Sequence, residues 1–444
     1  MRLYLVGGGV RNALLGLPAT DFDIASAALP GEVLALPLPG TAKEINRRLG
    51  TLEITLDDVR MEHTTFRRES YGPGGGHAPE RVEIGVSMEE DARRRDFSVN
   101  ALYMDVLSGE ILDPTGRGLA DLQARVLRTT TPDPAEILRD DGLRLLRLAR
   151  FYGQLGFRAD AALVREARRQ KGLIRDVSRE RIAGEMEKIL LCDVKYDKVS
   201  RVHPVLRALE LLHGTGVLEE LLPELRAAEG LPQKKKYHKY TVLQHIFHTV
   251  ACAPPELVLR LAALFHDVGK PEAVDRNGRM LRHDRIGARI ARERLPEWGF
   301  SREITEDVAA LVELHMYDLA GEARESRLRR KCQEVGYRRF LQLAALREAD
   351  VWGSGWETGP VATAERFRRV AAQMQAEGVP MTLRDLAVTG RDLMEELGIP
   401  PGPEVGRILR RLLALCANKP SQNTRERLLH AASPRRGAMS EKQT

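Results

Sequence analysis

The sequence contains few cysteines, few aromatic residues and no long apolar run. Its four cysteines, Cys192, Cys252, Cys332 and Cys416, are far apart and form no CxxC pair, which argues against a zinc ribbon and a disulfide framework. No stretch approaches the ~18 consecutive apolar residues of a membrane span, so we expect no membrane partner. Residues 1–7 lead directly into a predicted strand and leave no room for a signal peptide, so we expect a cytoplasmic protein.

The overall composition is typical of a folded chain with several domains. Its 444 residues are enough for about three domains. Hydrophobic residues at 43% and charged residues at 30% argue against disorder. The 69 Lys and Arg exceed the 63 Asp and Glu, and the net charge of +6 permits an acidic partner such as RNA without requiring one. Aromatic residues at 5% argue against extensive stacking on single-stranded nucleic acid.

The sequence pattern changes near residue 130. Short apolar runs and glycine-rich turns precede it, and helical spacing of Leu, Ala, Arg and Glu dominates from about 133. Residues 72–79 (GPGGGHAP) are too rich in glycine for regular structure. The predicted fold class is therefore α+β, a mixed sheet with helices followed by an all-helical remainder. The regular segments expected in the first part are strands at 3–6, 21–24 and 60–66 and a helix at 10–15.

Two aspartates, Asp21 and Asp23, lie two residues apart in a predicted strand. Because side chains alternate across a strand, both carboxylates point to one face. Such a pair suits Mg²⁺, which can bridge the oxygens of a triphosphate. Two-metal chemistry usually needs a third carboxylate on a neighbouring strand, and Glu62 is the candidate. We therefore assign Asp21, Asp23 and Glu62 as catalytic candidates, with the two aspartates as metal ligands.

A glycine turn precedes these aspartates. Gly7 and Gly8 follow the first predicted strand and come shortly before Arg11. Backbone amides in such a turn can cradle phosphates, and Arg11 can neutralise their charge. Together with the aspartates, the turn resembles the nucleotidyltransferase signature of the polymerase-β superfamily.

A second polar cluster lies at 93–101. Arg94 and Arg95 are candidates to hold a triphosphate. Asp96 and Asn100 are four residues apart, so on a helix they share a face and can bind a ribose.

Asp141 and Arg144 lie three residues apart in a Leu-rich segment that we expect to be one buried helix. They are either a structural ion pair or a base-selecting pair. An aspartate beside an arginine complements the edges of cytosine and adenine, whereas uracil and guanine present their donors and acceptors in the reverse arrangement. The pair can therefore admit C and A and reject U and G. Arg147 is a further nucleotide-binding candidate.

These motifs resemble, in order, those of the class II tRNA nucleotidyltransferases, the family that adds the 3′-terminal CCA to tRNA and includes bacterial poly(A) polymerases. The resemblance covers essentially the whole chain. It implies a polymerase-β-like head followed by a helical neck, body and tail. It also implies Mg²⁺ in the head, and CTP, ATP and the tRNA acceptor stem as substrates. The segments that carry it are 7–11, 21–23, 94–100, 141–147, 178–190, 390–393 and 398–402.

The sequence departs from the family pattern at two places. Asn12 stands where the family's GG-x-VRD motif has an aspartate. The stretch 72–79 lacks the Arg-Arg-Pro element of a loop that matters in this family for switching from C to A addition. Addition of CCA, of A alone and of CC alone therefore all stay open, and either partial activity implies a complementary partner enzyme.

Histidines and aspartates are spread over the helical middle of the chain. His266 and Asp267 adjoin each other after an apolar run. Such ligands on several helices can hold one or two divalent metal ions, with water as the nucleophile. The pattern resembles the HD phosphohydrolase superfamily, which implies phosphatase or 2′,3′-cyclic phosphodiesterase activity and ions such as Mn²⁺ or Ni²⁺. On that resemblance the ligands are His245, His266, Asp267 and Asp350, with His283 and His315 as auxiliary ligands.

The predicted domains are a catalytic head (1–125), a neck for base recognition (126–195), a body (196–235), an HD domain (236–370), a tRNA-binding tail (371–432) and a disordered end (433–444). Basic clusters at 165–171, 234–236, 327–331 and 407–411 can contact the tRNA backbone. The rival functions are a poly(A) polymerase, an HD phosphohydrolase that only binds RNA through its head, and a non-catalytic RNA-binding protein. The intact pair of aspartates argues against the second rival. The third would make both metal-site patterns accidental.

Overall fold

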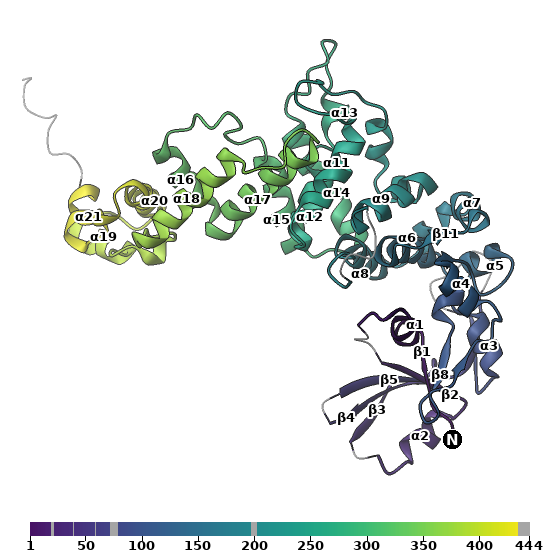
Figure 1. The fold of residues 1–444 in the computed structure, drawn as a ribbon. Coiled ribbons are helices and arrows are strands. Elements are labelled where there is room, and N and C mark those ends of the chain that lie inside the picture. The colour runs from purple at the N-terminus through teal and green to yellow at the C-terminus, as the bar shows by residue number, and fades with distance from the viewer. Residues whose placement is uncertain (19–21, 39, 58, 72–78, 197–201, 434–444) are drawn as a thin grey trace, which may run out of the picture.

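The computed structural model describes all residues except 19–21, 39, 58, 72–78, 197–201 and 434–444. The chain forms an arc, from a β-rich head through a helical middle to a helical tail (Figure 1). This architecture confirms the predicted α+β class. No helix within the described ranges has the length and apolar character needed to cross a bilayer. All four cysteines are free thiols.

A seven-stranded mixed sheet forms the head. Its strands lie in the order β3-β4-β5-β2-β1-β8-β9, and β2 pairs with β5 in parallel while the other neighbours are antiparallel. A separate antiparallel ribbon is formed by β6 (Arg67–Ser70) and β7 (Arg81–Ile84). The strands of the large sheet are β1 (Tyr4–Val6), β2 (Asp23–Ser26), β3 (Thr41–Asn46), β4 (Thr51–Leu56), β5 (Val59–Thr65), β8 (Tyr103–Asp105) and β9 (Ile111–Leu112). The helices of the head are α1 (Gly8–Leu15), α2 (Pro30–Leu34), α3 (Met88–Arg93), η1 (Ser98–Asn100) and α4 (Gly118–Ala124).

The regular segments predicted for the head are confirmed where the structure describes them. The strand predicted at 3–6 is β1, the strand at 60–66 is β5, and the helix at 10–15 lies within α1. For the strand predicted at 21–24, β2 begins at Asp23, and Asp21 lies outside the described residues. The glycine-rich stretch 72–79 also lies outside them, apart from Pro79.

Aromatic packing holds α3 against one face of the sheet. The rings of Tyr4, Phe66 and Tyr103 lie 5.9–6.4 Å apart, and Ala92 of α3 packs into the same cluster. Ser87 caps the start of α3, because its hydroxyl oxygen accepts from the Glu90 amide and the Glu90 carboxylate accepts from the Ser87 amide. The residues that follow α3 are therefore held beside β1.

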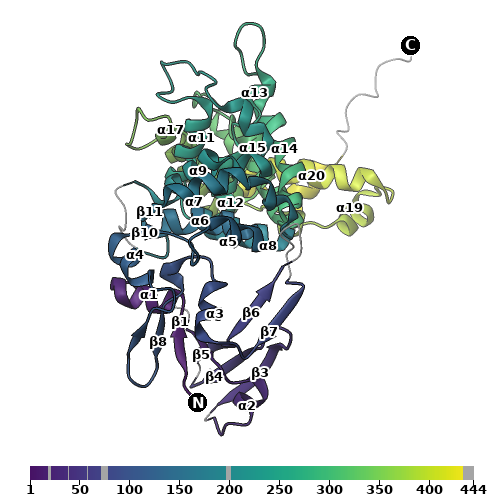
Figure 2. The same ribbon diagram turned by 90° about the vertical axis from the view of Figure 1, so that its right-hand side faces the viewer.

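One continuous hydrophobic core joins the helices of the middle. It runs from Val10 in α1 to Val379, so the packing does not separate the neck, the body and the HD region that we predicted. The boundaries between these three regions therefore stay a prediction. In Figure 2 the head lies below this helical layer, with α5 and α8 on the side that faces it. The elements that follow the head, up to residue 228, are β10 (Val126–Leu127), α5 (Pro134–Asp140), α6 (Leu143–Leu155), β11 (Arg158–Ala159), α7 (Ala161–Arg169), η2 (Lys171–Asp176), α8 (Arg179–Leu190), α9 (Pro204–Thr215), α10 (Val217–Leu221) and η3 (Pro223–Ala228).

The second half of the middle is entirely helical, and the tail has a core of its own. Arg329 links the two parts by donating a hydrogen bond to the carbonyl oxygen of Ala417 at 2.7 Å. The second half of the middle contains α11 (Val242–Cys252), α12 (Leu257–Phe265), α13 (Lys270–Ala273), α14 (His283–Trp298), α15 (Arg302–Leu314), α16 (Glu325–Val335), α17 (Tyr337–Gly353), α18 (Ala362–Ala376) and η4 (Leu383–Asp385). The tail contains α19 (Gly390–Leu397), α20 (Pro403–Asn418), η5 (Pro420–Gln422) and α21 (Arg425–Ala432).

Candidate functional site

A cleft of about 1060 Å³ lies between the head and the helices that follow it. Its walls come from α1, the start of β2, the segment around η1, and helices α6 and α8. It brings together most of the residues that we predicted to bind metal or nucleotide in the head and neck. Those that line it are Gly7, Gly8, Arg11, Asp23, Arg95, Asp96, Asn100, Asp141, Arg144 and Arg147.

Asp23 and Glu62 are neighbours on two parallel strands. They occupy the same register position of β2 and β5, so both side chains point to one face of the sheet. Partial desolvation, and then the negative charge of Asp23, raises the pKa of Glu62 above its ordinary value. This proximity agrees with the prediction of a third carboxylate on a neighbouring strand, although Glu62 is not part of the cleft lining.

Gly7 turns the chain from β1 into α1. Its φ of 75° is in the left-handed region that favours glycine. A Cβ atom there would lie 3.8 Å from the Asp23 carboxylate and 3.8 Å from the Arg95 guanidinium, so bare backbone adjoins both charged groups. The first amides of α1 carry the partial positive charge of a helix start, and Gly8 and Gly9 line the cleft. The turn is therefore suited to a phosphate.

Arg11 is buried and held in place by three side chains. Its Nη1 donates to Asn100 Oδ1 at 2.5 Å, and its Nη2 donates to Asn12 Oδ1 at 2.9 Å. Its Nη2 also donates to the hydroxyl of Tyr196 at 3.4 Å, and Asn12 Nδ2 donates to the same hydroxyl at 2.7 Å. Asn12, which departs from the family motif, thus accepts from Arg11 and donates to a residue that follows α8. The sequence analysis did not identify Tyr196.

Asp91 anchors the two arginines that we predicted to hold a triphosphate. Its Oδ1 accepts from Arg94 Nη2 at 2.7 Å, and its Oδ2 accepts from Arg95 Nη2 at 3.0 Å and from the Tyr103 hydroxyl at 2.5 Å. Although burial opposes ionisation, these two guanidiniums hold the pKa of Asp91 well below its ordinary range. Arg95 reaches the cleft, whereas Arg94 points to Glu69 at 3.3 Å and does not line it. The spacing of three and four residues between Asp91 and the arginines was the available sequence signal.

Asp96 links the head to α6. Its Oδ2 accepts from Arg147 Nε at 2.8 Å and from Nη2 at 2.5 Å, and its Oδ1 accepts from Asn100 Nδ2 at 3.1 Å. The predicted proximity of Asp96 and Asn100 is therefore confirmed, although η1 is a 3-10 turn and not an α-helix. Despite burial, which favours the neutral acid, Arg147 and the other donors lower the pKa of Asp96 to about 2.

The prediction of a single helix around Asp141 is wrong, because two helices meet there. Helix α5 ends at Asp140, and Asp141 has an extended backbone with φ −153° and ψ 108°. Its Oδ1 accepts from the amide of Leu143 at 3.1 Å, which is how an aspartate caps the start of a helix. Capping at Asp141 competes with helix continuation, and it explains the break before α6.

Asp141 pairs with a different arginine from the one that the spacing suggested. Its carboxylate accepts from Arg181 Nη1 at 3.1 Å and from Nη2 at 2.6 Å, and Arg181 lies on α8. Arg144 instead donates to two backbone carbonyl oxygens, those of Ile137 at 2.6 Å and Arg94 at 2.5 Å. All three side chains, of Asp141, Arg144 and Arg181, nevertheless line the same cleft.

Three guanidiniums surround the ring of Phe151. The guanidinium carbons of Arg150, Arg11 and Arg147 lie 4.2, 5.1 and 5.4 Å from its centroid. Cations over an aromatic face are stabilised by its quadrupole, which offsets part of their mutual repulsion. Neither Phe151 nor Arg150 is among the residues predicted from the sequence, although they lie four and three residues from Arg147 on α6. Arg147 and Arg150 are also paired with the carboxylates of Asp96 and Glu185, so Arg11 supplies the excess positive charge of this arginine-rich wall. Guanidiniums in such a wall suit a polyphosphate.

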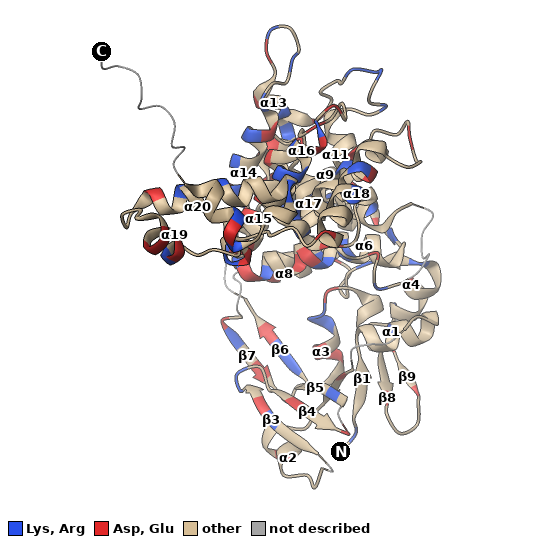
Figure 3. Cartoon of the chain, turned by 90° about the vertical axis from the view of Figure 1, so that its left-hand side faces the viewer, with Lys and Arg blue, Asp and Glu red and all other residues tan. Residues whose placement is uncertain are grey.

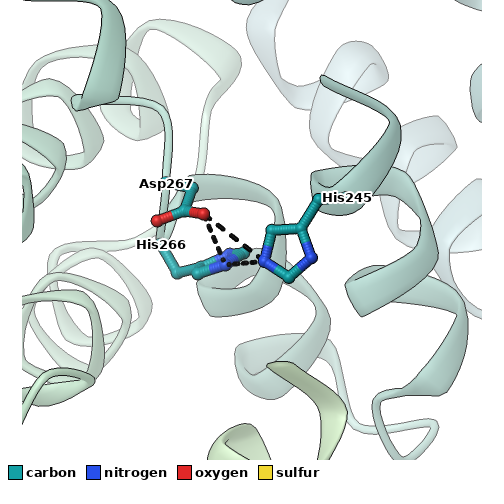
Figure 4. A group of neighbouring side chains, drawn as sticks. All are labelled: His245, His266 and Asp267. Atoms are coloured by element: carbon teal, nitrogen blue, oxygen red, sulfur yellow. Dashed lines mark hydrogen bonds and ion pairs between the residues drawn. The ribbon is translucent and has the colours of Figure 1, made fainter. Parts of the chain in front are cut away.

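The second predicted group meets in the helical middle. His245 of α11 points toward His266 and Asp267, which follow α12 (Figure 4). The Nε2 atoms of the two histidines are 3.1 Å apart and lie 3.4 and 3.3 Å from Asp267 Oδ2. Asp350 Oδ1 on α17 lies 3.0 Å from His245 Nε2. All four residues predicted as ligands are therefore in one place.

Asp267 belongs to two triads, the first with His245 and His266 and the second with His283 and His315. The Nε2 atoms of His283 and His315 are 3.2 Å apart and lie 3.4 and 3.9 Å from Asp267 Oδ1. Each oxygen of Asp267 thus faces one pair of histidines. Lys270 adds a positive charge, because its Nζ forms an ion pair with Asp267 Oδ2 and donates to Gln233 Oε1 at 2.6 Å.

Backbone carbonyls orient three of these imidazoles. The Nδ1 atoms of His266, His283 and His315 each lie 2.6–2.7 Å from the carbonyl oxygen of the residue three positions earlier. A carbonyl can only accept, so Nδ1 carries the proton and Nε2 presents its lone pair to the cluster. Burial lowers the pKa of His315 to about 3, which keeps this ring neutral. Despite burial, the carboxylates of Asp267 and Asp350 raise the pKa of His266 to about 10. A bound cation would take the place of that proton, so the converging imidazole and carboxylate atoms fit divalent metal.

Comparison with known protein families and relatives agrees with the architecture. Residues 3–128 match the poly(A) polymerase head domain, and residues 285–432 match a tRNA nucleotidyltransferase domain 2. The chain is 31% identical over 427 residues to an A-adding tRNA nucleotidyltransferase of Deinococcus radiodurans, covering 92% of this chain and 90% of the relative. It is 33% identical over 428 residues to a CC-adding tRNA nucleotidyltransferase of Thermus thermophilus, covering 92% of this chain and 88% of the relative.

A solved structure matches almost the whole fold. The crystal structure of the Bacillus stearothermophilus CCA-adding enzyme in complex with CTP aligns with a TM-score of 0.71 and 28% identity, covering 97% of this chain and 92% of that chain. Such coverage includes the helical middle as well as the head. In sequence and in fold, the chain thus belongs to the class II tRNA nucleotidyltransferases, the CCA-adding family, and it is an enzyme of this type.

Proposed function

We propose that this enzyme extends the 3′ end of tRNA with C, A or both, taken from CTP and ATP, without a nucleic-acid template. One observation carries the proposal: the cleft joins a carboxylate of β2, the bare amides at the start of α1 and an arginine-rich wall of α6 and α8. Carboxylates suit Mg²⁺, and amides and guanidiniums suit a triphosphate.

In this proposal, Asp21 and Asp23 hold Mg²⁺, and Glu62 is the third carboxylate. When bound, Mg²⁺ supplies neutralisation of phosphate charge and a lowered pKa for the attacking 3′-hydroxyl. The amides after Gly7 and the guanidinium of Arg11 hold the triphosphate. They orient its α-phosphorus toward the hydroxyl, so that pyrophosphate is the leaving group.

Asp96 and Asn100 are proposed to hold the ribose, and Asp141 to read the base. A carboxylate accepts from the amino group of cytosine or adenine, and a guanidinium donates to the adjacent ring nitrogen. Two guanidiniums can supply that donor. Arg144 was the predicted one, and Arg181 contacts the Asp141 carboxylate.

Labelled CTP and ATP incubated with three tRNA transcripts test this function. The transcripts end before the CCA, after C and after CC. Extension of all three to CCA is expected of a complete enzyme. Addition of A to the CC-ended transcript alone identifies an A-adding enzyme, and arrest after two C residues a CC-adding one. Failure to extend any transcript in the presence of Mg²⁺ contradicts the proposal.

The nucleotide specificity stays open among these outcomes. The relatives of similar identity include an A-adding and a CC-adding enzyme, so overall identity does not separate them. Either partial activity implies a complementary enzyme that acts in turn on the same tRNA. The basic clusters at 165–171, 234–236, 327–331 and 407–411 are proposed to contact the tRNA backbone, with the tail as part of that surface.

The His/Asp cluster favours a second activity, metal-dependent hydrolysis of phosphate esters. The two triads around Asp267 support this proposal, because in each triad the candidate ligand atoms all lie within 4.8 Å of one another. His245, His266, Asp267 and Asp350 would hold one ion, and His283 and His315 a second. When bound, Mn²⁺ or Ni²⁺ supplies an activated water for attack on phosphorus. The proposed substrates are phosphate monoesters and 2′,3′-cyclic phosphates of nucleotides or RNA ends.

Two matched variants separate the two activities. Asp23→Ala is expected to abolish nucleotide incorporation and to preserve hydrolysis of a 2′,3′-cyclic nucleotide. Asp267→Ala is expected to do the reverse. If either variant, folded as judged by circular dichroism, lost both activities, the two-site proposal would be wrong.

A further inference from the structure

Two exposed loops lie side by side at the His/Asp cluster. The first is the loop before α11, residues 231–240, and the second follows α17, residues 354–360. The amide of Lys239 in the first donates to the carbonyl oxygen of Ser354 in the second at 2.9 Å. A Cβ on Gly355 would lie 2.6 Å from the ring of Tyr240, so the two loops are in close contact.

Both loops adjoin the predicted metal ligands. His238 of the first loop packs edge-on against His245, with ring centroids 4.6 Å apart. The amide of Ser354 donates to the carbonyl oxygen of Asp350 at 3.1 Å. The side chain of Asp350 is 19% exposed, whereas that of His245 is 0% exposed. Asp350, which precedes the second loop, is therefore the more accessible of these two residues.

The loops carry two aromatic side chains in unusually exposed positions. Trp356 is 58% and Tyr237 57% exposed, and the described residues include one further exposed aromatic side chain, Phe22 at 38%. A lysine accompanies each ring: Lys239 Nζ lies 5.7 Å from the centroid of Trp356, and Lys236 Nζ lies 5.4 Å from that of Tyr237. Neither ring contributes to the buried core.

The charge of the loops is strongly positive. Residues 231–240 contain four exposed lysines, Lys234, Lys235, Lys236 and Lys239, and no carboxylate. The second loop contributes a single acidic residue, Glu357. Figure 3 shows the first loop as a mainly blue stretch that projects from the helical middle before α11. Exposed rings beside lysines match the bases and phosphates of a single-stranded nucleic acid.

We propose that these two loops are a binding platform for the single-stranded 3′ end of RNA, which they present to the His/Asp cluster. Bases stack on Trp356 and Tyr237, and the lysines bind the phosphates. This inference rests on the proposed phosphohydrolase function, and it specifies a polynucleotide as the substrate class. Several consecutive lysines favour a chain of phosphates over a mononucleotide, which offers phosphate at one position only.

Direct binding can be measured on the full-length, metal-free protein. The probe is a ten-nucleotide oligo(A) that ends in a 2′,3′-cyclic phosphate, and the readout is quenching of tryptophan fluorescence. Trp298 is buried, and Trp352 is partly buried with its Nε1 donating to the carbonyl oxygen of Gly359, so Trp356 is expected to contribute most of the quenchable signal. The oligonucleotide is expected to quench wild-type protein. In Trp356→Ala, the remaining fluorescence of Trp298 and Trp352 is expected to be quenched much less, and only at higher oligonucleotide concentrations. Leu107→Ala, at a side chain that is 91% exposed on the head, is the control and is expected to behave as wild type.

The enzyme loaded with Mn²⁺ provides a second readout. Trp356→Ala is expected to raise the KM for the oligonucleotide about tenfold at unchanged kcat, because one stacked base is lost. Hydrolysis of para-nitrophenyl phosphate, which has no base, is expected to be unchanged. Replacing Lys234, Lys235 and Lys236 by Gln is expected to reduce the slope of log affinity against log salt by about 2.

The outcomes distinguish the platform from the hydrolase. Quenching without hydrolysis by the loaded wild-type enzyme would support the platform and refute the phosphohydrolase. Equal losses for the oligonucleotide and for para-nitrophenyl phosphate would reveal a purely structural role of Trp356 and overturn the platform. If AMP bound as tightly as the oligonucleotide, the ligand would be a mononucleotide, and the proposal of a polynucleotide platform would be overturned. Quenching by phosphatidylglycerol vesicles but not by RNA would assign the surface to a membrane and also overturn the proposal.

Discussion

Asp141 and Arg181 face each other across the cleft through two hydrogen bonds of 3.1 and 2.6 Å, although they are forty positions apart in sequence. A bidentate ion pair of this kind fixes the plane of the carboxylate. It follows that the group proposed to read the base is positioned by Arg181 of helix α8. Arg144, three residues from Asp141, is occupied by backbone carbonyl oxygens.

Replacing the two arginines separately tests which one acts with Asp141. Arg181→Met is expected to raise the KM for CTP and ATP about tenfold, since the carboxylate loses a charged hydrogen-bond partner. Arg144→Met is expected to reduce discrimination against UTP if it donates to the base. Steady-state incorporation of CTP, ATP and UTP measures both. Arg302→Met, at an exposed residue in the first turn of α15, is the control, and unchanged kinetics in Arg181→Met would exclude its positioning role.

The register of β2 and β5 predicts that removing the Glu62 carboxylate impairs catalysis and that removing a nearby carboxylate, Glu53, does not. Glu62→Gln is expected to lower kcat for nucleotide incorporation by about 10²-fold or more, because a charge beside Asp23 is lost. Glu53→Gln is the matched control. Glu53 lies opposite Glu62 on β4 and is paired with Lys43 at 2.6 Å. Single-turnover incorporation should show a defect in Glu62→Gln alone, and equal defects would indicate general damage to the sheet.

Tyr196 is expected to keep Arg11 in place. Tyr196→Phe removes the hydroxyl that accepts from both Asn12 and Arg11, and the KM for the triphosphate should rise several-fold at nearly unchanged stability. Asn12→Ala should have a similar effect. Because the three residues form one network, the double variant is expected to be little worse than either single variant. Additive losses in this double-mutant cycle would show that Tyr196 acts independently of Asn12.

The buried histidine His63 of strand β5 predicts that the protein is less stable in mild acid. His63 is fully buried beside Ser26, and burial lowers its pKa from 6.5 to about 4. The unfolded chain therefore binds a proton between pH 6.5 and 4 that the folded chain does not. Stability is complete above pH 6.5 and decreases as the pH falls toward 4, by up to about 3 kcal/mol from this residue. Denaturant unfolding of wild type and His63→Gln at pH 7 and pH 4.5 measures the difference, which should be smaller in the variant.

Metal binding can be tested without any assay of hydrolysis. After chelation, Mn²⁺ or Ni²⁺ is expected to raise Tm, because ligands that bind the folded state stabilise it. With Mg²⁺ present to occupy the carboxylates of the head, calorimetry is expected to find two equivalents in wild type. The double variant His283→Ala and His315→Ala should retain one equivalent, and Asp267→Ala should weaken both. A single equivalent in wild type would contradict the shared role of Asp267.

Local sequence patterns were enough to predict several elements of the head and both groups of polar residues. Alternation and glycine placement predicted β1, α1 and β5, and the spacing of carboxylates, histidines and arginines identified both groups of polar residues. These signals are readable because side-chain direction repeats every two residues in a strand and every 3.6 in a helix. The same local patterns gave a wrong prediction at Asp141, because this aspartate caps the start of α6 and the helix before it ends.

Only the tertiary structure decided which charged groups meet. Arg181 reaches Asp141, Tyr196 reaches Arg11, and Asp267 serves two histidine pairs because helices far apart in sequence pack against one another. A guanidinium or an imidazole has several partners that are equally acceptable chemically. The choice among them depends on where a continuous apolar core places each helix, and that placement is a sum over many contacts that no short motif encodes.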